Sequence, residues 1–94
     1  METPMPTSTL TFDRGCLTDG AARCFLWADE PTLDRVRFEI PSNVLKHLGG
    51  GNPVHDDLNV ALCQRERQRI DDACRRAFAE RQSTRILLET RHFQ

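Results

Sequence analysis

Apolar and polar side chains alternate most regularly in residues 35–40. Val36, Phe38 and Ile40 are apolar, and the residues between them are charged. Successive side chains of an extended chain point to opposite faces, so this segment has one dry face and one wet face. Such a pattern is typical of a strand in an antiparallel sheet that is covered on one side.

Two segments before it also have strand character. Residues 9–12 alternate polar with apolar and predict a short edge strand. Residues 23–28 are rich in large apolar side chains, and so short a run favours a strand largely covered on both faces. Pro31 lies in the connection 29–34, and we expect the two longer strands to form a hairpin across it.

Helical signals follow. A short helix is predicted to begin at Ser42, a typical capping residue, and to end at glycines 49–51. A second helix is predicted to start at Asn52–Pro53 and to run to about Arg81, roughly 40 Å at 1.5 Å per residue. Its C-terminal half carries an apolar stripe at helical spacing, made of Ile70, Ala73, Cys74, Ala77 and Phe78.

The predicted long helix exceeds the strands in length, since strands of five or six residues span only about 20 Å. Asn59, Glu66 and Arg67 lie on or beside its projected apolar stripe. We expect the overhang to start at these polar positions and to meet solvent, the short helix or another subunit.

The elements together predict an α+β fold in one domain over residues 1–94. Residues 85–90 predict a last strand with Ile86 and Leu88 inward. We expect a three- or four-stranded, mainly antiparallel sheet packed against one long C-terminal helix, with a short connecting helix. Residues 1–8, rich in proline, serine and threonine, are expected to be frayed.

Composition indicates a water-soluble globular chain: of 94 residues, 38% are hydrophobic and 29% charged, with a formal charge of −1. The longest apolar run, residues 24–28, is far shorter than the 18 or so residues of a membrane helix, and residues 1–6 do not resemble a secretory signal. The four cysteines have no C-x-x-C spacing, so we expect free thiols in a reducing compartment and a cytoplasmic protein.

Charge is unevenly distributed. Residues 61–94 contain five acids and eight bases, and all eight bases are arginine. On a helix, Arg65, Arg69 and Arg76 share one face at i, i+4 and i+11. That face is either solvated, laced by Glu66–Arg69 and Asp72–Arg76 pairs, or the contact surface for a protein partner, because arginine is enriched at interfaces.

Glu66 and Arg67 are adjacent and straddle the apolar stripe, which leaves two interpretations. Arg67 either lies along the apolar surface with its head in water, or forms a half-buried charge pair at a subunit contact. The candidate interaction face therefore comprises Arg65, Glu66, Arg67, Arg69 and Arg76.

Catalytic, cofactor and metal sites are not predicted. Glycines 49–51 precede a helix, but no P-loop or dinucleotide-binding spacing surrounds them, so they are interpreted as a helix stop. His47, His55, Asp56 and Asp57 are metal-ligand candidates by residue type. His55 and the two aspartates share one helical turn, where consecutive side chains splay and cannot converge on one ion, and His47 would have to fold back across the glycines. Nucleophile signatures such as G-x-S-x-G are absent, and His92 has no recognisable partner in the sequence.

Several segments resemble a known pattern. These are residues 24–27 (CFLW) and 36–40 (VRFEI), the R-Q-R-I run at 67–70 with the aromatic Phe78, and a closing strand that ends at Phe93. The arrangement resembles the small bacterial domain-of-unknown-function family 1488, with Cys24 where that family has a first valine. The likeness covers residues 22–94 and implies an α+β domain without an assigned activity.

The sequence thus predicts a small cytoplasmic, non-catalytic protein that acts through contacts with a protein partner or with itself, a homodimer being one form. The alternative is an accessory nucleic-acid-binding protein that uses the arginine-rich helix face. An isoelectric point near 6.3 disfavours this alternative, since dedicated nucleic-acid binders are usually basic.

Overall fold

A computed structural model describes residues 10–12, 17–18, 24–49 and 56–93 of the chain. The predictions for residues 1–8 and for a helix start at Asn52–Pro53 lie outside these residues. The elements, in chain order, are β1 (Thr11–Phe12), β2 (Leu17–Thr18), β3 (Cys24–Glu30), β4 (Asp34–Ile40), α1 (Ser42–Gly49), α2 (Asp56–Arg65), α3 (Arg67–Glu80), β5 (Arg85–Leu87) and the 3-10 helix η1 (Thr90–Phe93). The α+β class is confirmed.

The described strands form one mixed sheet of five strands in the order β1-β3-β4-β5, with β2 paired to another part of β3. β1 is an edge strand, as predicted. Three of the pairings are antiparallel, but β4 and β5 are parallel, and the expected three or four strands become five. The long helical excursion between β4 and β5 explains the parallel pairing, because it returns the chain to the end of the sheet from which β4 started.

The β3–β4 hairpin is the longest pairing and turns more tightly than predicted. Its strands run to Glu30 and from Asp34, leaving a three-residue connection in place of the expected six. The carboxylate of Glu30 accepts hydrogen bonds from the backbone N–H groups of Thr32 (2.6 Å) and Leu33 (2.5 Å). Asp34 has a φ of 76°, a left-handed conformation that aspartate tolerates better than most residues. The side chain of Glu30 therefore stabilises the turn that sets the register of the hairpin.

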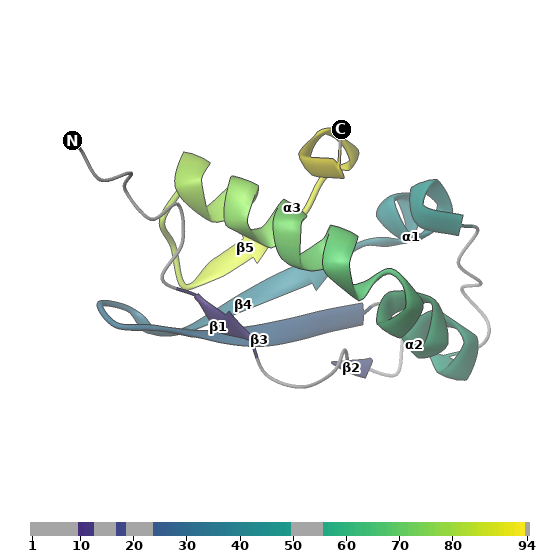
Figure 1. The fold of residues 1–94 in the computed structure, drawn as a ribbon, viewed down its shortest axis with the longest axis horizontal. Coiled ribbons are helices and arrows are strands. Elements are labelled where there is room, and N and C mark those ends of the chain that lie inside the picture. The colour runs from purple at the N-terminus through teal and green to yellow at the C-terminus, as the bar shows by residue number, and fades with distance from the viewer. Residues whose placement is uncertain (1–9, 13–16, 19–23, 50–55, 94) are drawn as a thin grey trace.

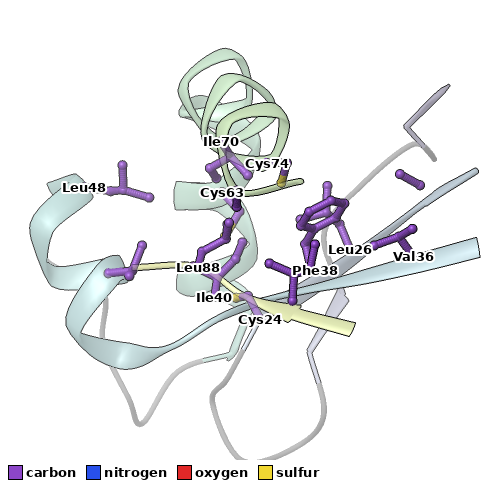
Figure 2. Packing of buried hydrophobic residues seen from close by; sticks show 14 of the residues in the cluster. Cys24, Leu26, Val36, Phe38, Ile40, Leu48, Cys63, Ile70, Cys74 and Leu88 are labelled. Carbon is purple, nitrogen blue, oxygen red and sulfur yellow. The ribbon is translucent and has the colours of Figure 1, made fainter. Parts of the chain in front are cut away.

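One hydrophobic core lies between the sheet and the helices (Figure 1). The predicted stripe of α3 is buried in full, and so are the inward residues Val36, Phe38 and Ile40 of β4. Figure 2 shows Ile70 and Cys74 of α3 above Phe38 and Leu26, with Leu88 beneath the helices. Fully burying one large apolar side chain contributes about 1.5–3 kcal/mol, so each of these buried side chains is a substantial contribution to the stability of the fold.

The predicted single long helix is wrong, because the chain bends at Glu66. This residue has φ −98° and ψ 21°, outside helical values, and α2 and α3 leave it in different directions (Figure 1). The hydrogen bonds from Glu66 N–H to the Leu62 carbonyl (2.9 Å) and from Ile70 N–H to the Glu66 carbonyl (3.0 Å) keep the two helices directly joined. A straight rod would overhang the sheet, whereas the bend folds Leu62 and Cys63 into the core.

The end of α1 approaches α2 closely. A Cβ on Gly49 would lie 3.1 Å from the Leu62 Cδ1 atom, so the glycine permits this contact while ending the helix where the sequence predicts. Of the three neighbours expected for this part of the helix, the short helix is the one observed, since α2 packs against α1. Asn59 does not begin an overhang, because its side chain is fully buried within the domain. No buried polar side-chain atom in the described part of the chain lacks a hydrogen-bond partner, so the Asn59 amide is satisfied.

Replacing Asn59 by alanine should lower the free energy of unfolding by about 1–3 kcal/mol, because its fully buried amide would no longer supply a hydrogen bond. Urea unfolding followed by circular dichroism measures the effect. Gln64→Ala is the matched control, since Gln64 is an exposed amide on the same helix and should change stability by less than about 0.5 kcal/mol. Equal small effects for both variants would contradict a structural role for the buried amide.

Candidate interaction surface

Helices α1 and α3 lie on one side of the sheet (Figure 1). The strand register places aromatic, aliphatic and charged side chains together on the opposite side. Strand alternation places them there, because every second residue of β3, β4 and β5 fills the core on the other side. We call this surface the open sheet face. It is formed by Leu17, Phe25, Trp27, Asp29, Arg35, Arg37, Glu39, Arg85 and Leu87.

Two aromatic rings stand side by side at its centre. Phe25 and Trp27 are 6.3 Å apart between ring centroids and nearly perpendicular at 89°. The guanidinium carbon of Arg37 lies 3.8 Å from the centroid of Phe25, and that of Arg35 lies 4.9 Å from the centroid of Trp27. Arginine over an aromatic ring contributes about 0.5–1 kcal/mol at an exposed site. The prediction that residues 23–28 form a strand largely covered on both faces agrees with the described residues 24–28, whose outer face is covered in part by these arginines and not by a helix.

Glu39 holds the arginines of the face in place. Its Oε2 atom accepts a hydrogen bond from Arg37 Nε at 3.0 Å and from Arg85 Nε at 2.8 Å, and Arg85 Nη2 lies 2.7 Å away. One carboxylate thus fixes Arg37 above Phe25 and joins β4 to β5. Beside it lies a pocket of about 100 Å³, lined by Cys24, Arg37, Glu39, Ile40, Pro41, Arg85 and Leu87.

Two leucines flank this arginine and aromatic centre. Leu17 on β2 is 49% exposed and Leu87 on β5 is 55% exposed, and no other large hydrophobic residue is exposed in the described ranges. Aromatic rings and arginines are the residue types enriched at protein interfaces. The open sheet face thus gathers interface-type side chains from four strands.

The helix residues predicted as an interaction face lie mostly at the bend between α2 and α3. Glu66 pairs with Arg69 at 3.0 Å, as predicted, and with Arg65 at 3.4 Å. The hydrogen bond from Arg69, followed by that from Arg65, lowers the pKa of Glu66. Arg67 donates from Nε to Asp71 Oδ1 at 2.9 Å and is half-buried. These positive charges are therefore largely answered by acids of the same helices.

Arg76, the fifth predicted residue, has a separate role. Its Nη1 atom donates a hydrogen bond to the backbone carbonyl of His92 at 2.8 Å, so it fastens η1 to α3. The structure brings Arg65, Glu66, Arg67 and Arg69 together at the bend between α2 and α3. It places Arg76 away from them, at the contact between α3 and η1. Their role as an interaction face stays a prediction.

His92 is buried and has partners that the sequence did not reveal. Its Nδ1 atom accepts a hydrogen bond from the Glu89 backbone N–H at 3.0 Å, and its Nε2 atom lies 3.3 Å from Glu80 Oε1. An acceptor at Nδ1 places the proton of the neutral ring on Nε2, facing Glu80. Arg91 donates to Glu80 and to Glu89, at 2.8 and 3.0 Å. The cluster ties η1 to α3. Glu80 and His92 are 12 positions apart, so no local sequence pattern indicates their contact.

The described residues contain no group of three or more histidine, cysteine, aspartate or glutamate side chains that could hold a metal ion. His47 is exposed and contacts the ring of Phe93, with 6.4 Å between centroids. The other candidates fall outside what the structure describes, His55 entirely and Asp56 and Asp57 in their side chains.

Cys24, Cys63 and Cys74 are buried and are not disulfide-bonded, as predicted, while Cys16 lies outside the described residues. In the portions of the chain that the structure describes, no helix is long and apolar enough to cross a membrane. These findings define the class of molecule as a small α+β domain whose sheet has one face covered by helices.

Comparison with known proteins finds no matching family model, no matching curated protein and no matching solved structure. The resemblance to family 1488 therefore stays a prediction, and no relative supplies a function for this chain.

The hydrogen bonds of Glu80 to Arg91 and His92 should make the stability of the protein depend on pH. Hydrogen bonds from Arg91 and then His92 lower the pKa of Glu80 from its ordinary value of 4.5. Its contribution is therefore present above the unfolded-state pKa and is lost as the pH falls through the lowered folded-state pKa. The melting temperature of Glu80→Gln should lie below that of the unsubstituted protein at neutral pH, and the gap should close in acid.

Gln82→Ala is the control for this series, because it replaces an exposed residue that does not titrate. Its difference from the unsubstituted protein should stay constant with pH. A gap for Glu80→Gln that is equally constant would show that the carboxylate does not stabilise η1.

Proposed function

We propose that this protein is a small, non-catalytic binding protein that acts through protein–protein contacts, with the open sheet face as its contact surface. The observation that supports the proposal most strongly is the juxtaposition of Phe25 and Trp27 with Arg35 and Arg37. Tryptophan and arginine dominate the binding energy of many protein interfaces, where they form compact clusters near the centre.

The ordering of this surface also favours binding. Glu39 already fixes Arg37 and Arg85, and the paired strands fix the rings, so a partner would lose little side-chain entropy on contact. Asp29 and Glu39 give the face both signs of charge, which suits a protein partner of mixed charge.

The bend between α2 and α3 is the weaker candidate surface. Its arginines pair with acids on their own helices, which is typical of a solvated helix face. Cys24, Cys63 and Cys74 are buried without disulfide bonds, which fits a reducing compartment, and we propose a cytoplasmic location on that ground.

Binding of single-stranded nucleic acid is a second candidate function. The observation in its favour is the outward aromatic pair of β3 beside three arginines, because bases stack on aromatic rings and on guanidinium planes. The acidic residues Asp29 and Glu39 on the same face and the formal charge of −1 favour the protein partner instead. This candidate also moves the nucleic-acid contact from the arginine-rich helices to the sheet.

Affinity capture from the native cell, quantified by mass spectrometry, tests the primary proposal. A specific protein should be enriched by the unsubstituted chain and lost with Leu17→Ser combined with Arg35→Glu, which alter two exposed residues of the open sheet face. The matched variant Arg65→Ala with Arg69→Ala changes exposed residues at the helix bend and should retain the partner.

Loss of the partner with the helix variant and retention with the sheet variant would overturn the assignment of the contact surface. Titration with single-stranded DNA and RNA separates the second candidate. Nucleic-acid binding should weaken steeply as salt rises, because phosphate contacts release counterions. Absence of binding at low salt would remove that candidate.

A further inference from the structure

β5 forms an edge of the sheet among the described strands. Its hydrogen bonds to β4 include one from Arg37 N–H to the Thr84 carbonyl at 2.8 Å and one from Leu88 N–H to the Glu39 carbonyl at 2.9 Å. Alternate residues of a strand direct their backbone groups to opposite sides, so Arg85 and Leu87 direct theirs away from β4.

The side chains along this edge are accessible. The side chain of Arg85 is 71% exposed, and Leu87 is 55% exposed. Near the outward backbone groups of Arg85 lies the Ser83 hydroxyl, 3.4 Å from its nitrogen and 3.3 Å from its oxygen. These contacts lie beyond ordinary hydrogen-bond lengths, so they leave the edge available to a competing strand.

We infer that β5 pairs antiparallel with β5 of a second copy of this chain, about a two-fold axis at Ile86. In this register Arg85 lies opposite Leu87 of the second copy. Arg85 and Leu87 both direct their backbone N–H and C=O groups away from β4, so Arg85 of one copy and Leu87 of the other can exchange two backbone hydrogen bonds. The two-fold axis generates a second, identical pair. The two sheets would then form one continuous sheet.

Charge complementarity favours a second copy over an unrelated strand. Outward positions along this segment are Ser83, Arg85, Leu87 and Glu89, and an antiparallel copy presents the same residues in reverse order. Glu89, whose side chain is 54% exposed, then lies diagonal to Arg85 of the second copy, within reach of a long side chain. Leu87 covers the aliphatic stem of Arg85 of the second copy.

This dimer goes beyond the proposed function and does not require it. The open sheet face stays accessible, because the new contact lies along one edge. In the dimer the two β5 strands would lie about 4.8 Å apart, the ordinary spacing of paired strands. The two open sheet faces would then form one surface about twice as wide across the strands.

Light-scattering mass measurement of the full chain over a wide concentration range tests the inference. The mass should approach twice the 10.8 kDa of one chain as concentration rises. Leu87→Pro removes only an outward N–H, which a proline on an edge strand can lack without breaking the β4 ladder, and its mass should halve to that of a monomer. Leu17→Ser, which alters the other exposed leucine, should keep the doubled mass.

Hydrogen exchange of the unsubstituted protein gives a readout that does not depend on whether the proline variant folds. The amide protons of Arg85 and Leu87 should exchange more slowly as the protein concentration rises. A monomer mass at every concentration, or exchange at these two amides that ignores concentration, would overturn the inference.

A doubled mass that Leu17→Ser abolishes and Leu87→Pro preserves would place the dimer on the open sheet face, which also overturns it. Failure of the proposed function is distinguishable from each of these results. It appears as a captured partner that the sheet-face substitutions do not release, whatever the mass of the protein.

Discussion

The apolar contact between α3 and the inner side of the β3–β4 hairpin is the constraint on which the other features of the structure depend. The helix contributes Ile70 and Cys74, and β4 contributes Val36, Phe38 and Ile40, all fully buried. Because side chains alternate along a strand, filling the inner side commits every second residue to the outer side. The composition of the open sheet face therefore follows from the same register that fills the core.

The bend at Glu66 follows from the same contact. α3 covers the sheet only from Arg67 onward, so the preceding helix must turn to bury Leu62, Cys63 and Asn59. The fully buried Asn59 of α2 is satisfied by hydrogen bonding, which ties this helix to one position more specifically than apolar packing alone. Of the polar positions that interrupt the apolar stripe of the sequence, Glu66 and Arg67 mark the site of the bend.

Much of the fold could be predicted from the sequence, because strand alternation and helical spacing are local signals. They locate β4, the stripe of α3 and the inward Ile86 and Leu88 correctly. The parallel pairing of β5 could not be predicted in this way, since it depends on where three helices return the chain. The bend could not be predicted because a polar residue such as Glu66 within a helical pattern has two equally good interpretations. It can mark the end of one helix, or it can lie on the exposed face of a continuous helix.

The open sheet face was missed for a different reason. Residues 24–29 contain the signal, since Phe25 and Trp27 alternate with the small or aliphatic Cys24, Leu26 and Ala28. A uniformly apolar run conceals such alternation, and only pairing with β4 shows that the two rings lie beside Arg35 and Arg37. The arginines of α2 and α3 are close together in the sequence, so the sequence predicts a surface there more readily than on the sheet.

Fluorescence quenching of Trp27 tests the central claim most directly, because it is the only tryptophan of the chain. Its ring is half-buried beneath Arg35 and beside Arg37, so iodide should quench it more strongly than caesium, since arginines attract the anion. Trp27 emission that neither ion quenches, and that matches a fully buried indole, would contradict an open sheet face with arginines at its centre.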